Sequence, residues 1–134
     1  MNISSFLFPK KDVAYIHSSS TLRQALEKLE NHYYTAIPII DSEGKYAGTL
    51  TEGDILWKMK NTAGLDFDHM HKVSIIEIKQ HVRNHPVSIN AHMEDMLALA
   101  ADQNFVPVID DEGIFIGIIR RKDVIEYYMK NITD

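Results

Sequence analysis

The chain has 134 residues, of which 45% are hydrophobic and 25% are charged, and it contains no cysteine. This composition is typical of a globular protein, and the absence of cysteine excludes a disulfide scaffold, a thiolate zinc site and a cysteine nucleophile. The net charge of −5 makes nucleic acid an unfavourable partner. Because no apolar stretch approaches the roughly 20 residues that span a bilayer, and the N-terminal residues lack the pattern of a secretory signal, we expect a cytoplasmic protein that is not inserted in a membrane.

The first half of the chain predicts a unit of short strands and amphipathic helices. A leading strand near residues 13–16 precedes a helix whose apolar face runs from Leu22 to Leu29. The apolar run 36–40 ends in the turn sequence Asp-Ser-Glu-Gly, so it is expected to pair antiparallel with a return strand at 46–50. A second helix, which carries Ile55, Leu56 and Met59, completes the order β-α-β-β-α.

The second half of the chain repeats this unit 69 residues later. Residues 37–54 and 106–123 align without a gap, and seven of the eighteen positions are identical, namely Pro, Ile, Asp, Glu, Gly, Gly and Asp. The same patterns predict a leading strand near 87–89, a helix with Met93, Met96, Leu97 and Ala100, strands at 105–109 and 115–119, and a closing helix with Val124, Ile125, Tyr128 and Met129.

We therefore predict an α+β fold of two β-α-β-β-α repeats related by a pseudo-two-fold axis. The first repeat spans residues 1–62 and the second residues 87–134. Residues 63–86, which include four histidines and a small apolar cluster, are expected to form a partly ordered linker with the leading elements of the second repeat. Pro38 and Pro107 lie inside strands, where a missing amide donor predicts an irregularity.

Both copies end on a pattern of glycine, two residues, a hydroxyl residue, two residues and aspartate. The first copy has Gly48, Thr51 and Asp54, whereas the second has arginine at the hydroxyl position, Arg120, ahead of Asp123. Thr51 and Asp54 have the spacing of a helix N-cap and its third residue, so capping by itself explains the pair. A helix start also attracts anions, and a carboxylate there can accept two ribose hydroxyls, so capping and ligand binding are both kept as hypotheses.

The tandem unit, the proline-containing strand and this closing pattern resemble the cystathionine-β-synthase (CBS) domain pair, or Bateman module. More narrowly, the chain is similar to the small stand-alone CBS proteins of Gram-positive bacteria. The resemblance implies tandem CBS domains that bind an adenosine-containing ligand, such as AMP, ADP, ATP, S-adenosylmethionine or cyclic di-AMP, in the cleft between the repeats. It implies a regulatory protein that signals to a partner protein, without enzymatic activity and without a cofactor.

The candidate ligand-binding residues fall into three groups. The motif supplies hydroxyl, carboxylate and basic side chains, and the strands around the two prolines offer an apolar slot and backbone partners for adenine. The resemblance adds the residues just ahead of the first helix of each copy. The set is Tyr15, Ile16, His17, Ala36, Ile37, Pro38, Thr51, Asp54, Val87, Ser88, Phe105, Val106, Pro107, Arg120, Arg121 and Asp123.

Two features of this set have alternative interpretations. The cations Arg120, Arg121 and Lys122 crowd the positive end of a helix, where a phosphate would relieve their repulsion, although solvation of long side chains explains them equally well. Phe105 either stacks on a bound adenine or is a core aromatic at the start of a buried strand. In the first copy Glu52 lies where the second has a basic residue, so the two sites are expected to differ.

The seven histidines raise the alternative of a metal or pH sensor. No cysteine and no carboxylate at ligand spacing joins them, so we predict no metal site. The apolar stripes on the two closing helices, together with Trp57, predict a homodimer, as in the disc-like dimers of the CBS family. An interaction or scaffold protein with degenerate clefts is the alternative function, and the sequence leaves open which adenine nucleotide binds and whether one or both clefts are occupied.

Overall fold

The computed structural model describes residues 1–32 and 34–132. By its contacts the chain divides into two compact units. We call residues 14–83 the first-repeat unit, and residues 1–13 together with 84–134 the second-repeat unit. Within the described residues, no helix combines the length and apolar character needed to cross a membrane.

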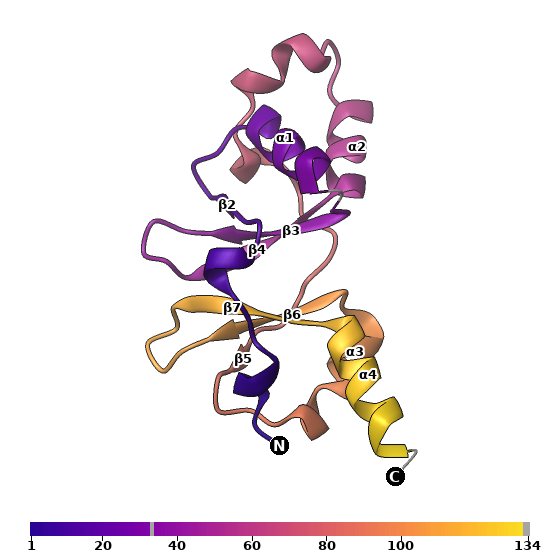
Figure 1. Ribbon diagram of the computed structural model, residues 1–134. Coiled ribbons are helices and arrows are strands. Elements are labelled where there is room, and N and C mark those ends of the chain that lie inside the picture. Colours follow the sequence, from indigo (N-terminus) through magenta and orange to yellow (C-terminus); the bar gives the residue numbers. More distant parts are fainter. Residues whose placement is uncertain (33, 133–134) are drawn as a thin grey trace. The chain divides into compact units, whose positions relative to one another are not determined.

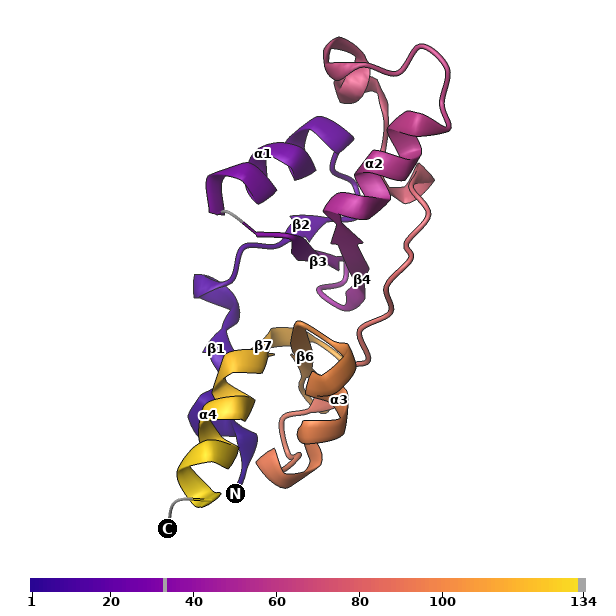
Figure 2. The same ribbon diagram turned by 90° about the vertical axis from the view of Figure 1, so that its right-hand side faces the viewer.

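The first-repeat unit is built on a three-stranded sheet in the order β2 (Ile16–His17), β3 (Ala36–Ile40) and β4 (Tyr46–Thr51). The central strand β3 is parallel to β2 and antiparallel to β4. Helices α1 (Leu22–His32) and α2 (Glu52–Lys60) both lie on one side of this sheet (Figures 1 and 2). Their apolar faces meet the strands in one core, as the predicted periodicity requires.

Residues 61–83 complete the core of the first-repeat unit. They contain two 3₁₀ helices, η3 (Phe67–Lys72) and η4 (Ile75–Glu77). Met70, Ile75 and Ile78 are buried in the same cluster as α1 and α2. The segment expected to be a partly ordered linker therefore packs on the first repeat, because its apolar residues are buried there.

The second-repeat unit has a four-stranded sheet in the order β1 (Phe8–Pro9), β7 (Phe115–Arg120), β6 (Phe105–Ile109) and β5 (Val87–Ser88). A 3₁₀ helix, η5 (Met93–Asp95), leads into α3 (Leu97–Asp102), and α4 (Arg121–Ile132) follows β7. The predicted β-α-β-β-α order is thus present in both repeats, with a shorter first helix in the second.

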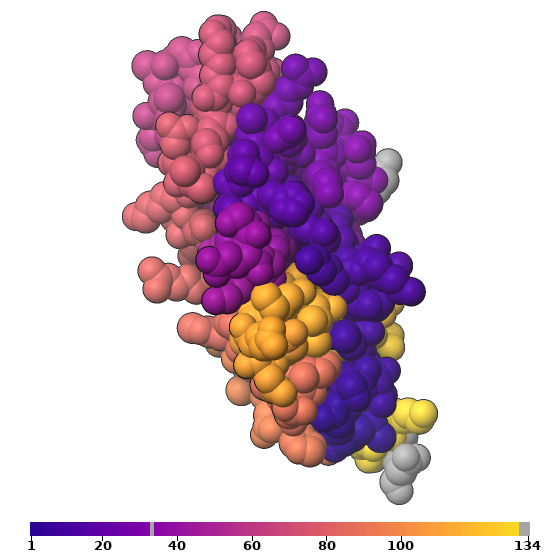
Figure 3. Space-filling view, turned by 90° about the vertical axis from the view of Figure 1, so that its left-hand side faces the viewer, coloured from indigo at the N-terminus to yellow at the C-terminus, as the bar shows by residue number. Residues whose placement is uncertain are grey.

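The N-terminal residues belong to the second-repeat unit. Two 3₁₀ helices, η1 (Ile3–Phe6) and η2 (Lys10–Asp12), flank β1, which pairs antiparallel with β7. Ile3 is fully buried in the core of this unit. Figure 3 shows the indigo N-terminal residues packed beside the orange residues of the same unit.

The packing units and the predicted repeat boundaries therefore differ. The sequence pattern assigns residues 1–62 to the first repeat and 63–86 to a linker, whereas residues 1–13 pack on the second repeat and residues 63–83 on the first. Residues 63–83 precede the second repeat but complete the first, and residues 1–13 precede the first repeat but complete the second. Residues 133 and 134, at the end of the predicted second repeat, lie outside the described residues.

The two prolines lie beside irregularities, as predicted. The register of β3 with β4 shifts between Ile39 and Ile40, and that of β6 with β7 shifts between Val108 and Ile109. Pro38 lies opposite Thr49, whose amide donates to the side chain of Gln80 (3.1 Å). The amide of Thr49 therefore donates outside the β3–β4 ladder at the position that faces Pro38. The proline ring costs this sheet little stability, because this pair of residues is not joined by that ladder hydrogen bond.

Candidate functional site

The start of α2 carries the complete motif of the first repeat. The amide of Asp54 donates to Thr51 Oγ1 (3.1 Å), and the amide of Thr51 donates to Asp54 Oδ2 (2.9 Å). This reciprocal pair is a capping box, which satisfies two amides that the helix itself leaves without partners. The capping hypothesis is confirmed, and it leaves Asp54 only 1% exposed.

The other oxygen of Asp54 is held by a residue outside the motif. Both the amide of His81 (2.9 Å) and its ring Nδ1 (2.6 Å) contact Asp54 Oδ1. A carboxylate can only accept hydrogen bonds, so the ring nitrogen is the donor. Sequence reasoning missed His81 because it lies 27 residues from Asp54, in a segment interpreted as a linker, and no regular spacing connects the two.

A small cavity of about 250 Å³ opens beside this pair. It combines an indole ring, two lysines and two amide or hydroxyl side chains with the Asp54–His81 pair. Its lining residues are Asp54, Trp57, Lys58, Asn61, Thr62, Glu77, Lys79 and His81. The motif carboxylate thus lies at the wall of a polar cavity, although its own oxygens are engaged within the chain.

The start of α4 carries an ion pair between the two motif residues. Arg120 Nε donates to Asp123 Oδ2 (2.8 Å), and its Nη2 donates to Asp123 Oδ1 (3.3 Å). The guanidinium also lies over the ring of Phe8, 4.6 Å from its centroid. The arginine that replaces the motif hydroxyl therefore engages both oxygens of the motif carboxylate.

The neighbouring cation, Arg121, is bound by carbonyl oxygens and not by a carboxylate. Arg121 Nε donates to the carbonyls of Ala100 (2.8 Å) and Gln103 (3.1 Å), where α3 ends. Carbonyls at a helix C-terminus lack intrahelical partners and attract cations. The repulsion that favoured a bound phosphate is thus relieved by Asp123 and by α3, and phosphate contact by Arg120 and Arg121 remains a hypothesis.

The structure brings the strand residues of each candidate set beside their motif. Ala36 pairs with Thr51 in the β3–β4 ladder, and Phe105 pairs with Arg120 in the β6–β7 ladder. Phe105 is 7% exposed, in agreement with its interpretation as a core aromatic. The side chains of Ile37, Pro38, Val106 and Pro107 are also buried.

The residues ahead of the first helices are less uniform. The rings of Tyr15 and His17 meet edge to face at 5.6 Å, and Lys28 donates to the carbonyl of Tyr15 (3.0 Å). Ile16 between them is buried. In the second repeat Val87 is half-buried, and Ser88 is exposed and accepts a hydrogen bond from the amide of Asn90 (3.1 Å).

No cluster of three or more histidine, aspartate or glutamate side chains able to hold a metal ion occurs in the part of the chain that the structure describes. One linker histidine, His69, contacts Asp66 at 2.5 Å, and this bond lowers the pKa of the Asp66 carboxyl. Both side chains are more than half exposed, which is typical of a surface pair.

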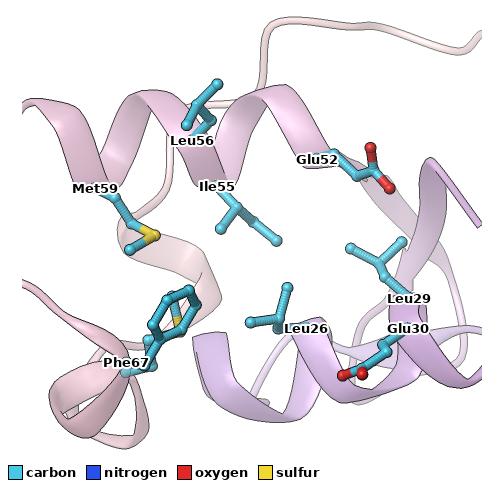
Figure 4. A pocket seen from close by; sticks show the side chains of 9 residues that line it. Leu26, Leu29, Glu30, Glu52, Ile55, Leu56, Met59 and Phe67 are labelled. Atoms are coloured by element: carbon cyan, nitrogen blue, oxygen red, sulfur yellow. The ribbon is translucent and has the colours of Figure 1, made fainter.

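An apolar groove of about 550 Å³ runs between α1, α2 and η3 in the first-repeat unit (Figure 4). Two acidic residues, Glu30 and Glu52, lie among its otherwise apolar lining. The apolar residues are Leu26, Leu29, Ile55, Leu56, Met59, Phe67 and Met70. Trp57, which is 45% exposed, lies on the same helix as Ile55, Leu56 and Met59 of this groove.

The predicted apolar stripes are only partly exposed. Ile55 and Val124 are buried in the cores of their own units, because each helix must turn one face to its sheet. Leu56, Trp57, Ile125 and Met129 are 45–63% exposed. Of the stripe residues predicted to mediate self-association, this second group is therefore exposed, whereas Ile55 is a core residue.

Comparison with known proteins gives one family. The CBS domain family model matches residues 3–61 and 77–130 of the chain. Cyclic di-AMP receptor B of Bacillus subtilis is 24% identical over 131 residues, which cover 97% of this chain and 88% of that protein. The inosine-5'-monophosphate dehydrogenase of Methanocaldococcus jannaschii is 27% identical over 116 residues, which cover 87% of this chain but only 22% of the enzyme.

Solved structures of similar length share the fold. The crystal structure of CbpB in complex with c-di-AMP superposes with a TM-score of 0.83 and 25% identity, and the match covers 100% of this chain and 88% of that one. A CBS domain protein from Streptococcus pneumoniae TIGR4 has a TM-score of 0.81 and 28% identity, with 97% and 88% covered.

Proposed function

This chain belongs to the CBS domain family, and on that premise we propose that it is a regulatory module that binds an adenine nucleotide and signals its presence to a partner protein. The extent of the matches carries this proposal. A protein named as a cyclic di-AMP receptor is matched over 88% of its length, whereas the dehydrogenase is matched over 22%. The receptor's role is thus the better guide, and the proposed ligand belongs to the AMP, ADP, ATP or cyclic di-AMP class. The proposal includes a cytoplasmic location and no catalysis.

The proposed ligand contacts are the motif residues and their neighbours in each repeat. In the first repeat they are Thr51 and Asp54, with residues 15–17 and 36–38. In the second repeat they are Arg120, Arg121 and Asp123, with residues 87–88 and 105–107. The polar cavity supports Asp54 of the first set, because this residue lines it, although the other residues of the set do not.

Calorimetry and thermal shift with cyclic di-AMP, AMP, ADP and ATP test the proposal, with GMP and GTP as controls. We expect one adenine compound to give saturable heat, and to raise the free energy of unfolding by about 2.7 kcal/mol at a hundred times its dissociation constant. An equal response to guanine nucleotides, or none to any adenine nucleotide, would contradict the proposal.

A variant of Asp54 tests the motif. Asp54→Ala should weaken the bound nucleotide about ten- to a hundredfold, because it removes charge-assisted hydrogen bonds to the ribose. Asp66→Ala is the matched control, since Asp66 also caps a helix of the first-repeat unit but that helix is η3, not α2. Equal loss of affinity in both variants would show that lost capping, and not ligand contact, is responsible.

An interaction protein with degenerate sites is the second candidate function. Its support is that Asp54 and Asp123 are both already engaged by side chains of this chain, His81 and Arg120 respectively. Under this function the chain still binds a partner protein, but the nucleotide panel gives no heat with either the wild type or a motif variant.

We also propose that the module forms a homodimer through the exposed apolar residues of α2 and α4. Leu56→Asp and Ile125→Asp would each place a charge where apolar surface is covered, and should shift the mass in light scattering from twice the 15.4 kDa chain toward the monomer. Ile76→Asp is the control, because Ile76 is even more exposed, at 75%, but lies in η4. A wild-type protein that is monomeric at micromolar concentration would overturn this assignment.

A further inference from the structure

Residues 79–81, which we call the strap, occupy one oxygen of the motif carboxylate, Asp54, in the first-repeat unit. His81 gives two donors to Asp54 Oδ1, its amide and its ring Nδ1. Asp54 Oδ2 is held by the amide of Thr51. The carboxylate is fully buried as a result, while the His81 side chain is 43% exposed.

The strap has a second contact, which depends on the motif glycine. Gln80 Oε1 accepts a hydrogen bond from the amide of Thr49 (3.1 Å). A Cβ atom built on Gly48 would lie 2.1 Å from this oxygen, so the strap is seated where the motif has no side chain. The motif glycine therefore leaves room for the strap, and the motif aspartate accepts hydrogen bonds from it.

The strap belongs to an exposed stretch between two buried residues, Ile78 and Asn84. Ile75 and Ile78, just before it, are buried in the core, whereas residues 79–83 are all exposed. Few buried apolar contacts hold such a segment, so it can open locally without unfolding the core. Opening would release Asp54 Oδ1 and leave in place the capping bond that the amide of Thr51 donates to Asp54 Oδ2.

The two donors of His81 match what a nucleotide ribose offers. A ribose presents one or two O–H donors to a carboxylate, and the strap presents two N–H donors to a single oxygen. We propose that His81 is a specificity-determining residue that occupies the ribose position on Asp54, so that a nucleotide reaches Asp54 only by displacing the strap. This inference rests on the proposed function, and it names the contact that the ligand must replace.

A ligand that needs Asp54 binds only to molecules in which the strap is open. Its apparent affinity is the intrinsic affinity multiplied by the fraction of such molecules. A ligand without ribose hydroxyls does not need Asp54 Oδ1, so its affinity does not depend on the strap. Removing the ring donor of His81 should weaken the strap, because only the backbone bond to Asp54 remains. The ligand-free protein becomes less stable while the nucleotide binds more tightly, a combination that loss of an ordinary structural or ligand contact does not produce.

Calorimetry of the full chain compares wild type, His81→Ala and the control His71→Ala, a histidine exposed in η3. The probes are cyclic di-AMP, AMP and dideoxy-AMP, the last of which has no ribose hydroxyl. His81→Ala should bind cyclic di-AMP or AMP about three- to tenfold more tightly than wild type. Dideoxy-AMP should change less than about twofold, and His71→Ala should match wild type with all three probes.

Hydrogen exchange at the His81 amide gives a test without mutation. Saturating nucleotide should accelerate this exchange in wild type, because the amide loses Asp54 as acceptor. Unchanged or lower affinity in His81→Ala, an equal gain by dideoxy-AMP, or slower exchange at His81 would each overturn the strap. If neither protein binds cyclic di-AMP, AMP, ADP or ATP, the proposed function fails together with the strap, and binding by His81→Ala alone would support both. If both proteins bind with equal affinity, the strap fails and the proposed function stands.

Discussion

The two helix starts that carry the repeated motif occupy the same place in each unit but are stabilised differently. At α2 a threonine hydroxyl and an aspartate form a capping box, and the spare carboxylate oxygen takes His81. At α4 an arginine forms a two-bond ion pair with the aspartate and stacks on Phe8. The aspartate is thus common to both, whereas its partner is a distant histidine at α2 and the neighbouring arginine of the motif at α4.

The segment that crosses each motif also explains the two glycines. In the second-repeat unit, β1 pairs with β7 so closely that a Cβ atom on Gly117 would lie 2.3 Å from the carbonyl oxygen of Phe8. In the first-repeat unit, the Gly48 position meets a side chain, that of Gln80. The motif glycine thus faces a paired strand, β1, in the second-repeat unit, whereas in the first-repeat unit it faces one side chain, that of Gln80.

The glycines give the largest expected effects on this comparison. Gly117 has φ of +156° and Gly48 has φ of +148°, so alanine is strained at both positions. Gly117→Ala should cost about 3 kcal/mol of stability, because backbone strain adds to a clash with a carbonyl that cannot move alone. Gly48→Ala should cost about 1–2 kcal/mol, since the end of Gln80 can swing away. Equal losses of unfolding free energy in urea would show that Gln80 at Gly48 is held as rigidly as the Phe8 carbonyl at Gly117.

The motif aspartates come next. Asp54→Ala should cost about 2–3 kcal/mol, because the amide of Thr51 and two donors of His81 lose a buried acceptor. Asp123→Ala should cost about 1 kcal/mol, since Arg120 is 38% exposed and water can hydrate its guanidinium. Chemical denaturation of both variants without nucleotide measures the difference, and a larger loss for Asp123 would reverse our account of the two sites.

Arg120→Thr would convert the second motif to the form of the first. Stability should change by less than about 1 kcal/mol, because a threonine cap offsets the lost ion pair and ring contact. If Arg120 blocks nucleotide at Asp123, calorimetry should show two ligands per chain in place of one. If it contacts a phosphate, ATP should lose more affinity than adenosine, and an unchanged isotherm for both would exclude either role.

The smallest effect concerns an exposed carboxylate of the second-repeat unit. The N-terminal ammonium of Met1 and the hydroxyl of Tyr127 donate to Glu94 and hold its pKa at about 2, below the ordinary 4.5. The stabilisation is therefore fully present above about pH 4.5 and is lost as the pH falls through 2. Glu94→Gln should flatten the fall of melting temperature between pH 5 and 2, and high salt should reduce the difference from wild type. A variant with the wild-type pH profile would show that Glu94 does not contribute.

Local patterns were enough to predict each repeat. The strands at 36–40 and 105–109 agree with β3 and β6, and the predicted capping pair Thr51–Asp54 forms as expected. These features depend on residues within a few positions of one another, through apolar periodicity, turn chemistry and helix capping. The repeat and its order β-α-β-β-α follow from the sequence for this reason.

The distant contacts of each motif depend on how the chain packs, whereas the Arg120–Asp123 pair is local. His81 reaches Asp54 across 27 residues, and Phe8 reaches Arg120 because the N-terminal segment pairs with β7. The same packing buries Ile55 and Val124, which periodicity alone could not distinguish from the exposed Leu56 and Ile125. The two repeats and their helix starts could be predicted because they depend on short-range patterns. Only the fold decided which distant segment closes each site, because that choice depends on which apolar residues find a common core.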